Sequence, residues 1–186
     1  GVQTCALPIF MLRGVLERGI PNIAIGCFWD PVAVRQCAEA GVGAHIDICI
    51  GGRHGPASGN PVSVEATVKQ WLPTHSQVAY DNAINPLGAA AWLELDNNVH
   101  VVMISTRTQT YSPGAFTDLG LELTELDAVV VKSTQHFYEK FSALSTDVCY
   151  VSTPGAMRTD FENIPYSHLE GDYWPKVADP LRLDEI

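Results

Sequence analysis

The segment IPNIAIGCFWDPVAVRQCAEAGVGAHIDICI, residues 20–50, decides the fold class of this chain. Its nearly unbroken apolar run at residues 23–29 is typical of a strand that is buried on both faces of a parallel sheet. Asp30 is a good N-cap for the helix that follows, and Gly41 is a good stop for it. Apolar residues return at 44–50 as a second strand. The segment therefore predicts a strand, helix, strand unit with a right-handed crossover.

Residues 61–105 follow the period of an antiparallel sheet instead. Apolar and polar residues alternate from 62 to 69, as in a strand with one solvated face. Farther along, apolar runs at 89–95 and 99–105 flank Asp96-Asn97-Asn98, which is typical of a hairpin. We therefore expect an antiparallel, β-rich insert in this part of the chain.

The parallel pattern returns after Asp127. We expect a strand at 128–132, then a helix that starts at Thr134, then a strand at 147–152. The helix should turn one face to the core, formed by Phe137, Phe141 and Leu144. The tail from Met157 is rich in Pro and aromatic residues and should wrap over the domain. The predicted fold class is α/β, a small parallel sheet with flanking helices plus an antiparallel β-rich insert.

Length and composition limit the class of protein. The 186 residues suit one domain with a full core. The net charge is −10 and no basic run interrupts the acidic excess, which argues against a nucleic-acid or anionic-membrane surface. No apolar stretch approaches the roughly 18 residues that a membrane helix requires. None of the five cysteines has C-x-x-C spacing. For the four outside residues 1–9, Cys27, Cys37, Cys49 and Cys149, we expect buried free thiols and hence a cytoplasmic location.

Residues 1–9, GVQTCALPI, do not match the rest of the chain. They lack the basic start and the apolar run of a secretory signal, and one reading frame of a common sequencing adapter encodes the same peptide. We therefore interpret residues 1–9 as an adapter-like artefact without native packing, and residues 10–186 as a single α/β domain. The helix predicted at 10–18 should then expose an apolar patch, because a preceding segment would be missing; its members are Met11, Leu12, Val15 and Leu16.

Candidate binding residues follow the predicted parallel strands, because ligands of such sheets gather beyond the carboxyl ends of the strands. Ser133 can cap the helix expected from Thr134, which places His136 in its first turn beside the positive end of the helix dipole. Lys132 adds a fixed charge, and Arg107 follows a neighbouring apolar strand. Together these residues would hold a carboxylate or a developing oxyanion. The alternative is that Lys132 is a solvated strand end and that His136 packs locally.

The sequence contains no complete catalytic or metal-binding motif. The glycine-rich loop at 51–55 lacks the Lys-Ser/Thr pair of a phosphate-binding loop and is interpreted as a turn. The six histidines form no H-x-x-x-H pair, and no cysteine or acidic cluster completes a tetrahedral zinc site. The G-x-S-x-G motif of serine hydrolases is also absent. We therefore assign no catalytic residue and no metal ligand to this chain.

Four blocks of the sequence, in this order, resemble a known family. They are DPVAVRQCAEAGVGAHIDICIGG (30–52), VVMISTRTQTYSPGAFTDLGLE (101–122), VVVKSTQHFYEKFSALS (129–145) and STPGAM (152–157). The order is similar to the C-terminal domain of the MlrC, or microcystinase C, type metallopeptidases. The most specific pieces are the run at 30–43 and Lys132-Ser133-x-x-His136-Phe137.

This resemblance implies a truncated C-terminal domain of a two-domain, zinc-dependent hydrolase of linear peptides, whose metal ligands lie in the N-terminal domain. It also implies a glycine-rich segment before the helix, where the adapter-like peptide stands. The missing N-terminal domain would then be a partner, zinc would be bound only by the full-length parent, and the fragment alone would be inactive. The expected substrate-binding residues are Lys132, His136, Arg107 and Ser133. Assembly into a homo-oligomer is left open, and the alternative is a non-catalytic ligand-binding or subunit-interface module.

Overall fold

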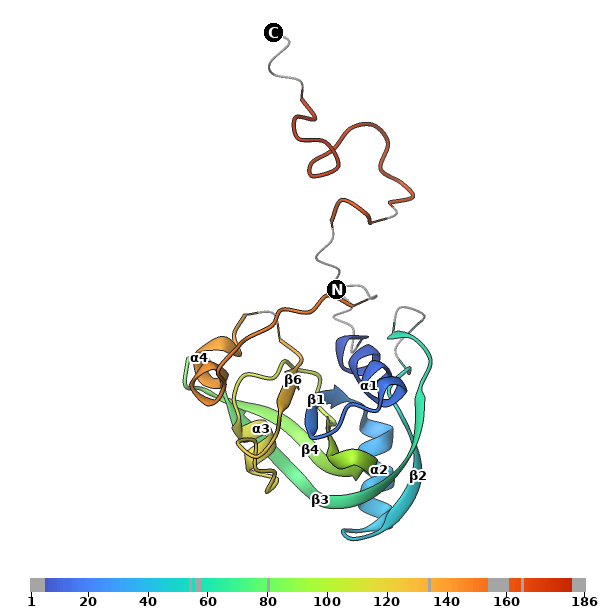
Figure 1. Cartoon of the computed structure of the whole chain (residues 1–186), viewed down its shortest axis with the longest axis vertical. Helices are drawn as coiled ribbons and strands as arrows, with labels where there is room; N and C mark the ends of the chain where they lie inside the picture. The colour runs from blue at the N-terminus through green and yellow to red at the C-terminus, as the bar shows by residue number, and fades with distance from the viewer. Residues whose placement is uncertain are drawn as a thin grey trace.

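One sheet organises the part of the chain that the structure describes, which is residues 6–53, 55, 58–79, 81–133, 135–153, 161–164 and 166–181 (Figure 1). In this computed structural model the strands are β1 (Ile23–Trp29), β2 (His45–Ile50), β3 (Val62–Val78), β4 (Ile84–Leu95), β5 (Val99–Ile104) and β6 (Ala128–Val131). The α-helices are α1 (Ala6–Arg18), α2 (Pro31–Ala40), α3 (Gly114–Thr117) and α4 (Tyr138–Phe141). Short 3-10 turns include Asp96–Asn98 and Ser142–Leu144. No helix among the described residues is long and apolar enough to cross a membrane.

The sheet has a parallel half and an antiparallel half, in the strand order β2-β3-β4-β5-β1-β6. β1 runs parallel to β5 on one side and to β6 on the other. β4, β3 and β2 then follow β5 with antiparallel pairing. The predicted α/β class is confirmed. The predicted hairpin is also present between β4 and β5, where Asn97 and Asn98 have positive φ angles of 58° and 55°.

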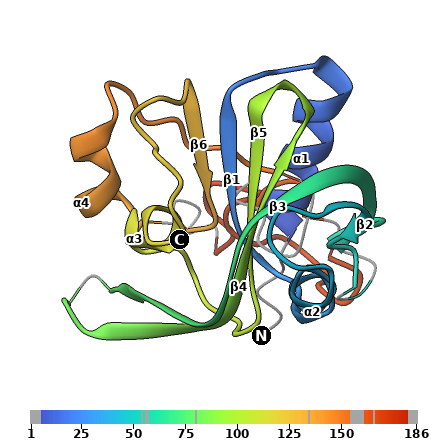
Figure 2. The ribbon, with the colours of Figure 1, turned by 90° about the horizontal axis from the view of Figure 1, so that it is seen from below.

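Helices cover both faces of the sheet. Ile23 and Ile25 of β1 belong to the core under α1 and α2, whereas Ala24 and Cys27 belong to the core that includes α3 and α4 residues. Figure 2 shows α1 and α2 on one side of the strands and α3 and α4 on the other. Because both faces are covered, β1 and β5 are buried along nearly their whole length, which explains their unbroken apolar sequences.

The position of β2 differs from the prediction. The sequence analysis made β2 a parallel neighbour of β1, but β2 lies at the far edge of the sheet and pairs antiparallel with β3. β5 and β6 already occupy both sides of β1. In β2 the exposed His45 and Asp47 precede the buried Ile48 and Ile50, in a pattern with one solvated face. A strand with one solvated face suits the antiparallel edge of a sheet. The apolar content of residues 44–50, taken alone, therefore led to the wrong prediction of a parallel strand.

The end of the domain also contains less regular structure than expected. The helix expected from Thr134 starts at Tyr138 and has four residues, and Leu144, expected on its buried face, is 47% exposed. Residues 147–152, expected as a strand, form none. Tyr150 instead contacts Phe137, with ring centroids 5.8 Å apart, so this segment packs through side chains and does not pair with a strand.

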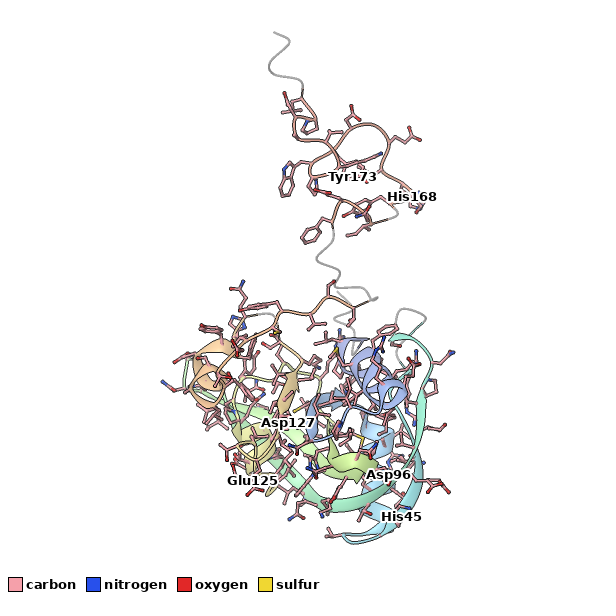
Figure 3. All side chains as sticks on the ribbon, in the orientation of Figure 1. His45, Asp96, Glu125, Asp127, His168 and Tyr173 are labelled. Atoms are coloured by element: carbon pink, nitrogen blue, oxygen red, sulfur yellow. The ribbon has the colours of Figure 1, made fainter. Side chains whose placement is uncertain are left out.

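The tail was expected to wrap over the domain. Residues 154–160 lie outside the described part of the chain. Residues 166–181 form no helix or strand and extend away from the sheet, as the labelled His168 and Tyr173 show in Figure 3. The wrapping prediction is therefore wrong for residues 166–181.

α1 begins at Ala6, inside the segment interpreted as an adapter-like artefact. Ile9 is fully buried, and its Cδ1 atom lies 2.6 Å from the point where a Cβ atom on Gly51 would lie. The expectation that residues 1–9 do not pack is therefore wrong for Ile9, while residues 1–5 lie outside the described part. Leu12 and Val15, expected in an exposed patch, are buried in the same core, because α1 turns one helical face to the sheet.

Candidate functional site

The carboxyl ends of the three parallel strands lie at one edge of the sheet, where the sequence predicted binding residues. β5 and β1 end level with each other, since Trp29 is the register partner of Ile104. β6 ends earlier, because Val131 is level with Gly26 and the Lys132 N–H donates to the Gly26 carbonyl over 2.9 Å. This difference leaves unpaired backbone groups of β1 beyond the end of β6.

Residues 105–112, which we call the site loop, pair with these backbone groups. The Thr110 N–H donates to the Lys132 carbonyl over 3.0 Å, and Thr110 Oγ1 accepts from the Cys27 N–H over 2.9 Å. Thr110 is fully buried, so each of these buried backbone groups has a partner. The site loop is therefore a fixed extension of the sheet edge.

All four predicted binding residues lie in the site loop or against it. Arg107 is part of the loop, and the Lys132 carbonyl accepts from Thr110. The Ser133 hydroxyl donates to Gln109 Oε1 over 3.2 Å. The His136 ring lies 5.9 Å from the ring of Tyr111, centroid to centroid. The structure thus brings Arg107, Lys132, Ser133 and His136 to one region around residues 107–111.

The local geometry of Ser133 and His136 differs from the prediction. α4 starts at Tyr138, so His136 precedes the helix and does not lie in its first turn. Ser133 does not cap α4, because Phe137 occupies the N-cap position and the Ser133 hydroxyl bonds to Gln109. A helix dipole therefore does not explain the chemistry of His136; α4 has four residues and begins after it.

Arg107 lies over the end of β1. Its guanidinium carbon is 5.4 Å from the centroid of the Trp29 ring, which is within the range of a cation–π contact. The Trp29 indole N–H in turn donates to the Ser105 carbonyl over 3.1 Å. The aromatic ring thereby orients the exposed arginine above the sheet edge.

Charge is distributed unevenly between the two edges of the parallel strands. Arg107 and Lys132 lie at the carboxyl edge, in a chain whose net charge is −10. Asp96, Glu125 and Asp127 lie at the opposite edge, just before β5 and β6 begin (Figure 3). With this arrangement of charge, an anion binds more favourably at the site loop than at the opposite edge of the sheet.

Sequence reasoning missed several residues that build the site. Tyr111 could have been found, because it follows closely on the apolar strand β5. Gln77 of β3 could not, because its side chain bonds to residues 32 to 35 positions farther along the chain.

A second polar cluster joins α2 to the loop after β2. Asp30 is 1% exposed and accepts from the Ala33 N–H over 3.0 Å, as an N-cap does, and from the Gly51 N–H over 2.8 Å. The Arg53 Nε donates to both Asp30 oxygens over 3.0 and 3.2 Å, and its terminal NH₂ donates to the Cys49 carbonyl over 2.9 Å. The predicted helix cap is confirmed. Both carboxylate oxygens of Asp30 are hydrogen-bonded within the fold.

The cysteines and other potential metal ligands in the described part of the chain form no metal site. Cys27 and Cys37 are buried, whereas Cys49 and Cys149, also expected to be buried, are exposed. Burial raises the pKa of the Cys27 thiol to about 11 and that of Cys37 to about 12, so both stay protonated at neutral pH. Within the described ranges, no group of three or more His, Cys, Asp or Glu residues could hold a metal ion. The described residues therefore do not fit a zinc site.

Comparisons with known proteins give consistent matches. Residues 8–168 match the family described as MlrC C-terminus. The chain is 29% identical over 143 residues to "Microcystinase C" of Sphingomonas sp., in an alignment that covers 77% of this chain and 28% of that protein. A solved structure of a candidate metallopeptidase from Mesorhizobium sp. BNC1 shares the fold, with a TM-score of 0.75 and 21% identity. That match covers 91% of this chain and 34% of the other, so the chain spans about a third or less of the relatives it matches.

Proposed function

The chain belongs to the MlrC C-terminus family, and we propose that residues 10–186 form the C-terminal domain of a two-domain zinc metallopeptidase that hydrolyses linear peptides. In this proposal the zinc is bound by the N-terminal part of the parent protein, as the family resemblance implies. The task of this domain is to bind and orient the peptide, and the domain alone is inactive. The cytoplasmic location expected from the free thiols is part of the same proposal.

The grouping of cationic and polar side chains around the site loop carries this proposal. Arg107 and Lys132 present positive charge at the carboxyl ends of parallel strands, the edge at which ligands of such sheets bind. A peptide carboxylate, or a carbonyl oxygen that gains negative charge during hydrolysis, matches these donors. Ser133 and His136 contact Gln109 and Tyr111 of the same site loop. Their side chains can hydrogen-bond the peptide backbone.

The test uses the two-domain parent that carries this domain. Lys132→Ala, Arg107→Ala and His136→Ala are compared with Arg35→Ala, which removes an exposed cation from α2. We expect the site variants to keep their zinc and to lose on the order of 100-fold in turnover of a linear peptide, as for the loss of one oriented donor. Wild-type turnover in all three site variants would refute the site.

The non-catalytic alternative gives a different result in the same experiment. A ligand-binding or subunit-interface module would bind a carboxylate peptide through Lys132 and Arg107, and its parent would need no zinc and would hydrolyse no peptide. A parent that binds no zinc and cleaves no peptide would therefore exclude the metallopeptidase and leave the module.

A further inference from the structure

The distal parts of β3 and β4 form an arm that extends beyond the parallel strands. β4 pairs with β5 as far as Ala90, which is the register partner of Ile104, the last residue of β5. Residues 73–78 of β3 and 84–89 of β4 continue past this point as a two-stranded ribbon, which Figure 2 shows reaching away from β1 and β5. The arm thus lies on the same side as the site loop.

Gln77 of the arm bonds to the backbone of the site loop. Its Nε2 donates to the Gln109 carbonyl over 2.7 Å, and its Oε1 accepts from the Tyr111 N–H over 2.8 Å and from the Ser112 N–H over 3.3 Å. The side chain is 2% exposed, so water does not compete for these bonds. Asn85, on the other strand of the arm, accepts from the Thr108 hydroxyl over 3.0 Å.

A glutamine amide matches this segment of backbone because it offers a donor and an acceptor from one planar group. The loop presents one carbonyl and two N–H groups to it. A glutamate would keep the acceptor and lose the donor, and a methionine of similar length would lose both. The contact is therefore specific for the amide.

The bonds of Gln77 flank Thr110, which is the second anchor of the site loop. Thr110 ties the loop to β1 and to Lys132, whereas Gln77 ties it to the arm on both sides of that point. The two residues that Gln77 holds, Gln109 and Tyr111, are those whose side chains contact Ser133 and His136. Without Gln77, residues 109–112 would retain only the Thr110 anchor among these bonds, while the Thr108 hydroxyl would still bond to Asn85, so the segment after Thr108 could change its angle about Thr110.

We propose that Gln77 is a positioning residue, through which the β3–β4 arm sets the orientation of the site loop for peptide binding. The inference rests on the proposed function, since it concerns the same binding residues. It assigns to the arm a part in peptide binding that is separate from its contribution to the sheet.

The test uses the chain as it stands, with tri-alanine as the probe peptide. Amide hydrogen exchange in residues 107–112 and the tri-alanine Kd, from NMR titration, are measured for Gln77→Met and Gln77→Glu. Gln36→Met, at an exposed position of α2, is the matched control. Exchange in β1 and β5 reports whether each variant is folded.

We expect Gln77→Met to speed exchange in residues 107–112 by roughly tenfold, the factor that corresponds to the loss of one net hydrogen bond, and to weaken tri-alanine binding by a similar factor. Gln77→Glu should behave in the same way at neutral pH. The tri-alanine affinity of Gln77→Glu is compared with that of the wild type at the same pH. This ratio should rise as the pH falls through the range in which carboxyl groups become protonated, because a protonated carboxyl can again donate to the Gln109 carbonyl. The other ionisable groups near Gln77 are His75 of the arm, Asp118 and Lys140, and they are the same in both proteins, so the ratio removes their effect.

Unchanged loop exchange in Gln77→Met would overturn the inference, and so would faster exchange with an unchanged Kd. If Gln77→Met does not fold, the pH dependence of tri-alanine binding by Gln77→Glu tests the inference in its place. Binding by Gln77→Glu that does not recover at low pH would count against a positioning role. If the wild-type chain binds no tri-alanine, the proposed function fails, and the binding role of Gln77 fails with it. The supporting result is faster exchange in residues 107–112 of Gln77→Met together with tri-alanine binding roughly tenfold weaker than in the wild type.

Discussion

Asp30→Ala removes a buried carboxylate that has three kinds of partner. The carboxylate caps α2 through the Ala33 N–H, accepts from the Gly51 N–H and pairs with the Arg53 guanidinium. Alanine at this position leaves the Ala33 and Gly51 N–H groups without this acceptor, while Arg53 keeps only its bond to the Cys49 carbonyl. The substitution therefore tests whether one side chain joins α2 to the loop after β2.

The expected loss of stability follows from the burial of each partner. Removing a helix cap costs about 1 kcal/mol. The buried Gly51 N–H loses its acceptor, which costs about 1–3 kcal/mol. The Arg53 side chain is 31% exposed, so water can solvate its guanidinium. Loss of the ion pair therefore lowers the free energy of unfolding by less than about 1 kcal/mol. We expect about 3 kcal/mol in all, or a fall in Tm of roughly 6–12 °C for a chain of this size.

Urea unfolding followed by circular dichroism measures this loss. Asp30→Asn keeps one acceptor oxygen and should lose about half as much, while Glu39→Ala, at an exposed position of α2, should stay within about 0.5 kcal/mol of wild type. A loss of about 1 kcal/mol or less in Asp30→Ala, the value of a cap alone, would refute the reasoning for Gly51 and Arg53.

Three further predictions concern burial. Iodoacetamide at neutral pH should alkylate the exposed Cys149 and spare Cys27, whose pKa of about 11 keeps the thiol protonated until the pH approaches that value; equal labelling by mass spectrometry would contradict this. Ile9→Ala should lower the free energy of unfolding in urea by about 2–4 kcal/mol, and an unchanged value would restore residues 1–9 as an unpacked artefact. Gly52→Ala should lower the Tm more than Gly19→Ala, because both glycines have positive φ angles (68° and 60°) but only at Gly52 does an added Cβ overlap neighbouring backbone. Equal Tm values would contradict that comparison.

Local signals predicted the elements whose stability is local. The apolar run of β1, the Asp30 cap of α2 and the Asp96-Asn97-Asn98 turn were all visible in the sequence, and the structure contains each of them. The family resemblance, drawn from blocks of the same sequence, is confirmed by the match over residues 8–168. The position of Lys132 and Arg107 after parallel strands was also predicted, because such residues lie at the carboxyl edge whatever the strand order, and their role in binding stays a prediction.

Features that depend on distant partners were not visible. β2 has the composition of a core strand, yet its place at the edge follows from β5 and β6 taking both sides of β1. The helix expected from Thr134 had an adequate cap and an apolar face, but the Ser133 hydroxyl bonds to Gln109 instead. Gln77 carries no local signal at all, because its role arises from a loop more than thirty residues away. Periodicity and capping express interactions within a few residues, whereas strand order and the geometry of the site depend on which groups compete for the same partners once the chain is folded.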